Sequence, residues 1–178
     1  MANTFSSNPR GTLKGDRNIL FARGKPTNGR HFLFGAGSAL TADPDPALIS
    51  ARSADRGAQE DSIRIAWTGK ASATAALVGE PVDLTREANG DVALVIDLKV
   101  DEAPTAPVLL GGRDVTTRLT ALATGKQWGQ IAVPLRCLVG TPLDRVTQPL
   151  TLTTAGRLDL TISAIRFASP PEGVVDCR

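Results

Sequence analysis

The chain is 178 residues long, which suits a single domain that can bury most of its apolar surface without metal ions or disulfide bonds. Its 17 glycines and 12 prolines, with five Phe, two Trp and no Tyr, indicate many short elements joined by turns and favour an all-β fold. The formal net charge of +2 is too small to imply nucleic acid or a membrane surface as a partner, and no apolar run approaches the roughly 20 residues of a membrane span.

The N-terminal segment is rich in basic and turn-forming residues. Residues 1–30 hold six Lys and Arg against Asp16 alone, and only the apolar stretch NILFA interrupts their turn signals. We expect a linker or extended arm, because the segment lacks the interleaved aromatics that stack on nucleic-acid bases. The opening MANTFSSNPR is too polar for a secretory signal.

The rest of the chain has the pattern of strands separated by Gly, Pro and Asp. SIRIAWT alternates apolar and polar residues, and EANGDVALVIDLKV joins the hairpin signal Asn89-Gly90 to a longer alternation. Strands are predicted at 31–35, 62–68, 92–100, 106–112, 118–124 and 127–138, followed by a last hairpin over 147–168 that turns at Ala155-Gly156. This spacing predicts a β-sandwich.

Two of these strands carry irregularities. QWGQIAVPLRCL contains Pro134, which has no N–H to donate, so we expect this strand at a sheet edge or with a bulge, with Ile131 and Val133 facing inward. In the last hairpin the inward-facing alternation slips near Ser163-Ala164, which predicts a β-bulge there.

The short motifs do not amount to a catalytic or metal site. FGAGSAL imitates a dinucleotide fingerprint, but Leu40 stands at the third glycine position and a proline-containing loop replaces the helix. His31 is the only histidine, and its setting favours a solvated or packed side chain. Two cysteines and one histidine fall short of the usual four zinc ligands.

Carboxylates gather in two loops. Asp55, Glu60 and Asp61 lie in RSADRGAQEDS, and paired carboxylates can hydrolyse glycosides, although a polar turn before a strand is the stronger interpretation. Asp43 and Asp45 in DPDP could donate oxygens to calcium, but two aspartates on a proline-stiffened turn are weak evidence.

The two tryptophans have alternative interpretations. Trp67 is in register with Ile63 and Ile65, which places it in the core. Trp128 could stack on a sugar ring, yet its position at the start of a strand favours packing.

The motifs QEDSIRIAWTGKA, ALVIDLKV, QWGQIAVPLRCL and VTQPLTLTTAGRLDLTISAIRF, with the terminal DC, resemble in order a known domain. It is the C-terminal galactose-binding-like domain of bacterial exo-1,3/1,4-β-glucanases and β-glucosidases of glycoside hydrolase family 3. The resemblance implies a linker from the preceding domain over 1–45 and the jelly-roll domain over 46–178. It supplies no catalytic residue, because the nucleophile and the acid/base of that family lie in other domains.

The resemblance implies an accessory domain that packs on the catalytic domains of a periplasmic or secreted β-glucosidase. Two alternatives remain: a module that binds β-glucan oligosaccharides through Trp128, and a free-standing interaction or adhesion domain. An exported parent also favours a disulfide between Cys137 and Cys177, which would anchor the end of the chain after Pro170 and Pro171 stop the last strand. Two separate reduced thiols are the alternative.

Overall fold

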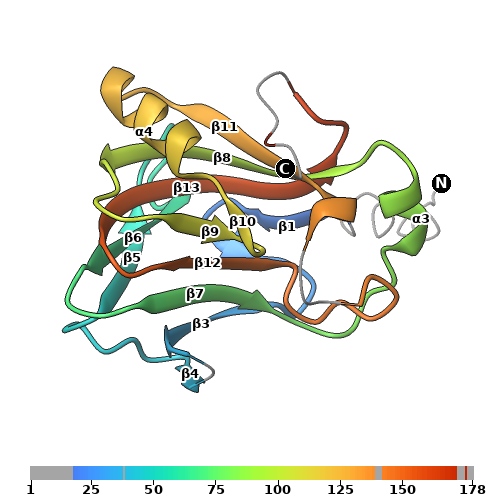
Figure 1. Cartoon of the computed structure of the whole chain (residues 1–178), viewed down its shortest axis with the longest axis horizontal. Helices are drawn as coiled ribbons and strands as arrows, with labels where there is room; N and C mark the ends of the chain where they lie inside the picture. Colours follow the sequence, from blue (N-terminus) through green and yellow to red (C-terminus); the bar gives the residue numbers. More distant parts are fainter. Residues whose placement is uncertain (1–17, 38, 139–141, 172–174, 176–178) are drawn as a thin grey trace, which may run out of the picture.

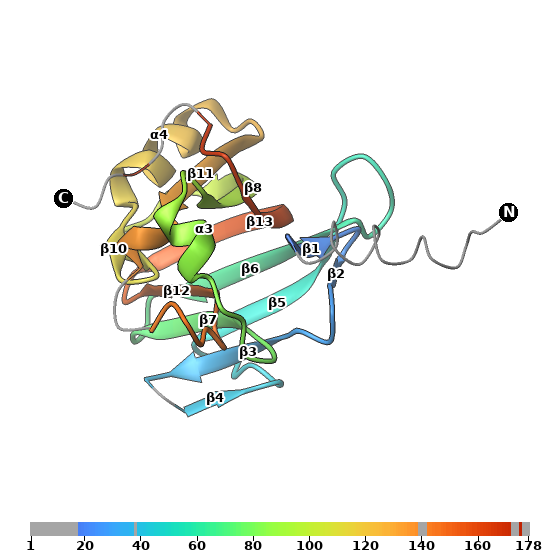
Figure 2. The same cartoon turned by 90° about the vertical axis from the view of Figure 1, so that its right-hand side faces the viewer.

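The computed structural model describes residues 18–37, 39–138, 142–171 and 175. Two antiparallel sheets pack face to face, which confirms the predicted β-sandwich (Figures 1 and 2). The seven-stranded sheet contains β1 (Ile19–Ala22), β2 (Lys25–Pro26), β5 (Ile49–Ala54), β6 (Ser62–Thr68), β8 (Ala93–Glu102), β11 (Gly129–Pro134) and β13 (Arg157–Ala168). The six-stranded sheet contains β3 (His31–Ala36), β4 (Ala39–Thr41), β7 (Ala73–Val78), β9 (Val108–Leu110), β10 (Arg113–Asp114) and β12 (Leu150–Thr154).

The last strand, β13, organises the seven-stranded sheet. One edge of β13 pairs with β8, and its other edge pairs first with β6 and then with β1. Beyond these neighbours, β11 pairs with β8 and β5 pairs with β6. The six-stranded sheet runs in the order β10-β9-β12-β7-β3-β4. Strands that are far apart in the sequence therefore share one polar outer face.

Alternation along the strands builds the core. Most of the predicted inward residues of β8, β6 and β11 are buried between the sheets, among them Ile65, Trp67, Leu98, Ile131 and Val133, and Ile63 is partly buried against them. The indole Nε1 of Trp67 donates a hydrogen bond of 3.0 Å to the carbonyl of Ala73, so the one polar group of this buried side chain has a hydrogen-bond partner. The core position predicted for Trp67 is confirmed.

The predicted domain boundary at residue 45 is too late. Within residues 19–41, β1 and β2 belong to the seven-stranded sheet, and β3 and β4 belong to the six-stranded sheet. Leu20, Phe21 and Phe34 of these strands are buried in the core. The turn-forming residues of this region close tight strand connections instead of forming a linker. Residues 1–17 of the predicted arm lie outside the described residues.

The two predicted irregularities are confirmed. Strand β11 is the edge strand of its sheet and ends at Pro134, where the missing N–H costs no central ladder bond. The pairing of β13 with β8 shifts register between Ile162 and Ala164, as expected for a bulge at Ser163.

Three local predictions are wrong. Residues 118–124, predicted as a strand, lie in helix α4 (Thr116–Gly125), and residues before Asn89-Gly90 form the short helix α3 (Thr85–Asn89) instead of a hairpin strand. The strands flanking Ala155-Gly156 do not pair, because β12 and β13 belong to different sheets. A turn signal marks only a reversal of the chain. At Asn89-Gly90 the chain passes from β7 to β8, and at Ala155-Gly156 from β12 to β13, and each connection joins one sheet to the other. The helices lie at opposite ends of the sandwich (Figure 1), and neither is long and apolar enough to cross a membrane.

Candidate functional site

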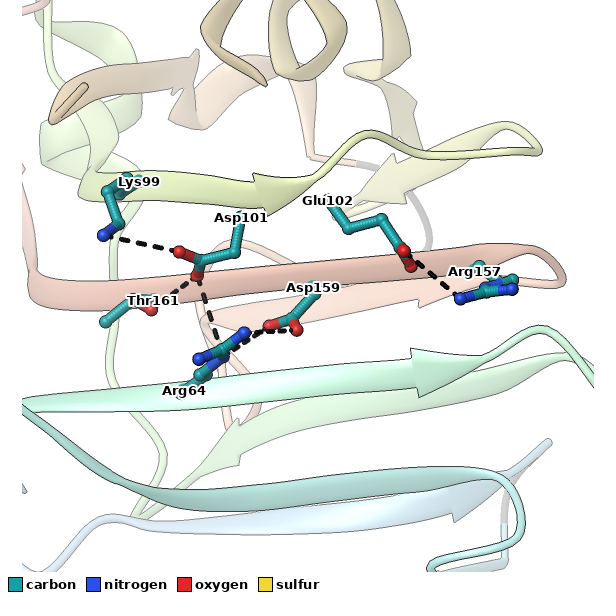
Figure 3. Close-up of polar contacts among 7 residues, drawn as sticks. All are labelled: Arg64, Lys99, Asp101, Glu102, Arg157, Asp159 and Thr161. Atoms are coloured by element: carbon teal, nitrogen blue, oxygen red, sulfur yellow. Dashed lines mark hydrogen bonds and ion pairs between the residues drawn. The ribbon is translucent and has the colours of Figure 1, made fainter. Parts of the chain in front are cut away.

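The outer face of the seven-stranded sheet carries a cluster of paired charges. Arg64 on β6 binds both oxygens of Asp159 on β13, with Nε to Oδ1 and Nη2 to Oδ2 distances of 2.8 Å each (Figure 3). Asp101 on β8 lies 3.4 Å from Lys99 Nζ and accepts a 2.7 Å hydrogen bond from Thr161. The hydrogen bonds to Asp159, with the charges of Asp159 and Asp101, raise the pKa of Arg64 above its ordinary value. These carboxylates therefore serve as structural partners of cations.

A second group extends this face to the edge strand. Asp97 on β8 accepts hydrogen bonds from Arg166 Nη1 at 2.9 Å and from Gln130 Nε2 at 2.7 Å, so both of its oxygens are occupied. The carbonyl of Gln130 in turn accepts a 3.2 Å hydrogen bond from Nε of Arg118 on α4. Helix α4 is thereby tied to the sheet edge.

Trp128 stands at the rim of a hollow at this edge. The hollow is shallow and open to the surface, has a volume of about 350 Å³, and is lined by Arg56, Asp97, Arg118, Trp128, Gly129 and Gln130. The guanidinium carbon of Arg56 lies 4.4 Å from the centroid of the Trp128 ring, and Lys99 Nζ lies 6.0 Å from it. Such contacts are attractive because the ring face is electron-rich. Trp128 is half-buried, so it packs against the protein and also lines the surface hollow.

The loop before β6 shows what the predicted carboxylate cluster does. Asp61 accepts backbone hydrogen bonds from Arg56, Gly57 and Ala58 at 2.6, 2.9 and 2.9 Å. The N–H groups of Gly57 and Ala58 contribute most to holding the pKa of Asp61 far below its ordinary value. Asp61 is thus an organiser of the loop, as the polar-turn interpretation expects.

Its neighbours in the loop follow the same logic. Asp55 accepts a 2.6 Å hydrogen bond from the backbone N–H of Glu60, which adopts a positive φ of 55° to close the turn. The loop presents Arg56, whose Nη1 donates to the hydroxyl of Ser163 at 2.9 Å, to the face of the sheet. The structure brings the carboxylates together around backbone amides rather than across a substrate cleft.

The weak calcium candidates lie on an exposed loop. Asp45 accepts a 3.0 Å hydrogen bond from the backbone N–H of Ala47, and the carbonyl of Asp43 accepts one from Thr41. Among the described residues there is no group of three or more His, Cys, Asp or Glu side chains that could hold a metal ion. Asp43 and Asp45 therefore have structural turn contacts, and calcium binding there stays untested.

The remaining predicted residues divide between core and surface. Cys137 is buried at the end of a 3₁₀ turn, η1 (Leu135–Cys137), that follows β11. Cys177 lies outside the described residues, so the Cys137–Cys177 bridge stays a prediction. His31 begins β3 with an exposed side chain, in agreement with the solvated interpretation.

Comparison with known families identifies the fold. Residues 38–167 match the model of the Exop_C family, which is described as galactose-binding domain-like. The chain belongs to this family. The match begins at residue 38, so it includes β4, whereas β1, β2 and β3 precede it.

Two solved structures share the galactose-binding-like fold of this chain. An exo-1,3/1,4-beta-glucanase (ExoP) from a Pseudoalteromonas species matches with a TM-score of 0.68 and 20% identity, over 89% of this chain and 21% of that chain. The extra C-terminal domain of that enzyme, solved by itself, matches with a TM-score of 0.68 and 21% identity, over 89% of this chain and 96% of that domain. The chain thus spans about a fifth of the whole exo-glucanase, and the likeness shows the fold. No curated protein matches the sequence significantly.

Sequence reasoning about this galactose-binding-like domain missed four residues of the hollow: Arg56, Asp97, Arg118 and Gln130. Each is an ordinary polar residue in a strand, helix or loop, and they converge only through the pairing of β8 with β11 and the docking of α4. The one available signal is the spacing of Asp97 and Gln130 on the polar sides of two adjacent strands, which pair directly.

Proposed function

We propose that this chain is a non-catalytic accessory domain of a glycoside hydrolase of the family 3 β-glucosidase or exo-β-glucanase type. Its role is to pack on the catalytic body and stabilise it. One observation carries the proposal: 89% of the chain superposes on 96% of an extra C-terminal domain of an exo-glucanase, so the two units are nearly coextensive. The motifs shared with that family in the same order support the same assignment.

The chemistry of the described carboxylates supports a role without catalysis. Retaining and inverting glycosidases need two carboxyl groups that face each other across the scissile bond. Here Asp97, Asp101 and Asp159 are bound by cations, and Asp61 is bound by backbone amides. Carboxylates with these partners are engaged in contacts within the domain and do not form a pair that faces a substrate cleft.

The proposal includes an exported parent enzyme that is periplasmic or secreted. Its support is the resemblance to exported hydrolases, and an oxidising compartment is one in which the predicted Cys137–Cys177 bridge would persist.

Thermal unfolding of the complete parent enzyme tests the stabilising role. We expect that removing residues 18–178 lowers the Tm of the catalytic body while leaving kcat/KM for a soluble aryl β-glucoside nearly unchanged. An unchanged Tm after removal of the domain would contradict the proposal.

Trp128 at a surface hollow favours one second candidate, a module for neutral β-glucan. Sugar rings bind tryptophan through the flat indole face, and the guanidinium of Arg56 covers that face at 4.4 Å. A neutral pyranose would have to displace this contact, so we expect neutral glucan to bind weakly at best.

A further inference from the structure

The hollow beside Trp128 has an excess of positive charge. Within the described part of the chain, neither Arg56 nor Arg118 forms an ion pair with a carboxylate; they donate instead to the Ser163 hydroxyl and the Gln130 carbonyl. The one carboxylate that lines the hollow, Asp97, is already paired with Arg166. Lys99 Nζ lies 6.0 Å from the centroid of the Trp128 ring but is paired with Asp101, so the excess charge comes from Arg56 and Arg118.

The two guanidinium groups retain donors for a ligand. A guanidinium carries five N–H donors, and Arg56 uses Nη1 while Arg118 uses Nε in these contacts with the protein. The remaining N–H groups of both residues can form the paired hydrogen bonds that a carboxylate accepts in fork-to-fork geometry.

Arg56 is also held in place before any ligand binds. Its guanidinium rests on Trp128, its Nη1 is bound to Ser163, and its backbone N–H is bound to Asp61. An arginine that is already ordered loses less conformational entropy on binding than a free one. The loop that Asp61 holds together therefore positions the Arg56 guanidinium at the rim of the hollow before a ligand binds.

The size and lining of the hollow fit a small polar ligand. A volume of about 350 Å³ falls within the range of small-molecule sites, roughly 300–1,000 Å³. Gln130 lines the hollow with its amide held by Asp97, and the partly buried Trp128 contributes an aromatic side chain to the same lining. A sugar ring that bears a carboxylate combines the anion, the hydroxyls and the apolar C–H groups that these side chains can contact.

We propose that the hollow beside Trp128 binds a uronate residue of an acidic oligosaccharide, with its carboxylate held between Arg56 and Arg118. The choice of a sugar as the ligand rests on the proposed role in a glycoside hydrolase, whereas the need for an anion comes from the charge of the hollow. We expect the site to prefer an acidic sugar to neutral glucan, because Arg56 occupies one face of the indole and offers its donors to a carboxylate.

Calorimetric titration of the purified chain tests this site. We expect an oligogalacturonate to bind at least tenfold more tightly than a cello-oligosaccharide of the same length, and its affinity to fall as salt rises from about 50 to about 500 mM. Equal affinity for the charged and neutral oligosaccharides would overturn the proposal. Equal or tighter binding of an oligoglutamate peptide would overturn the assignment of the anion to a sugar.

Substitutions locate the binding. Arg56→Gln and Arg118→Gln should each weaken oligogalacturonate binding at least tenfold, whereas Arg86→Gln, on α3 at the other end of the sandwich, should leave it unchanged. Retained affinity in both rim variants would overturn the proposal. These titrations use the isolated chain, so their failure is separate from a failure of the Tm test on the parent enzyme.

Discussion

At the residue scale, Asp61 shows how a carboxylate cluster can be structural. Three consecutive backbone amides, those of Arg56, Gly57 and Ala58, converge on its two oxygens within 3 Å. Its hydroxyl neighbour Ser62 adds a fourth donor at 3.1 Å. Because the ionised form accepts all of these bonds, the loop and the position of Arg56 depend on the charge of Asp61.

This dependence predicts how stability changes with pH. The pKa of Asp61 in the folded protein lies below its ordinary value of about 3.9, so its ionised form contributes stability above that pH. The contribution is lost as the pH falls from about 4 toward the lower folded-state pKa. Urea unfolding at pH 6, 4 and 3 should show a smaller acid-induced loss in Asp61→Asn than in the native chain.

A neighbouring carboxylate provides the control for this measurement. Glu60→Gln is the matched control, because it removes a carboxyl group from the same loop that accepts no hydrogen bond from the described residues, while the backbone N–H of residue 60 still binds Asp55. An Asp61→Asn profile that parallels the native one from pH 6 to pH 3 would contradict the role given to Asp61.

At the scale of elements, alternation in the sequence predicted strand positions better than strand partners. The predicted segment 62–68 coincides with β6, and the alternation through Val100 matches the buried face of β8. When one face of a strand is buried, apolar and polar residues alternate along it, and this alternation is visible in the sequence. Partners depend on which sheet each strand joins, and a turn signal such as Ala155-Gly156 carries no information about that.

Helix α4 was missed although a helical signal was present. Val115, Leu119, Leu122 and Ala123 pack against the core at helical spacing, i, i+4, i+7 and i+8. In the short segment 118–124, bounded by polar residues, the same letters also fit a strand. Asp114, just before this segment, is the sequence feature that favours a helix over a strand. In the structure its carboxylate accepts a 2.8 Å hydrogen bond from the N–H of Thr116 at the start of the helix.

The N-terminal elements give a prediction about packing. Gly24 joins β1 to β2 with a φ of 82°, and a Cβ added to it would lie 2.0 Å from the carbonyl oxygen of Glu60. We expect Gly24→Ala to lower the free energy of unfolding by about 1–3 kcal/mol, because a backbone oxygen must move and the residue is left-handed. Chemical denaturation measures this change.

Gly29 is the matched control for Gly24. Its φ is 74°, but a Cβ there meets nothing within 4 Å, so Gly29→Ala carries only the conformational cost. Equal effects of the two substitutions would show that β1 and β2 do not pack on the 55–61 loop, and would restore the linker interpretation of this region.

The predicted Cys137–Cys177 bridge belongs to the same scale, since it would join the end of the chain to the turn after edge strand β11. A closed loop of about 40 residues should contribute on the order of 3–4 kcal/mol. Thiol titration of unfolded, unreduced protein should find no free thiol, and reduction should lower the Tm. Two titratable thiols per chain in oxidised material would contradict the bridge.

At the scale of the whole molecule, the polar face emerges from the order of the strands. Strand β13 comes last in the sequence yet lies between β6 and β8, so Arg64, Asp159 and Asp101 meet across three strands (Figure 3). Likewise, the hollow beside Trp128 combines a loop, a helix and two strands. The fold class could be predicted from alternation and resemblance, but these convergences required the sheet order.

The central claim is that this molecule is a folded accessory domain without a catalytic centre of its own. The most direct test is an assay of the purified chain for release of nitrophenol from aryl β-glucosides, alongside the parent catalytic body as a positive control. We predict no turnover above the uncatalysed rate. Turnover that survives repurification and disappears in Glu60→Gln or Asp61→Asn would contradict the claim.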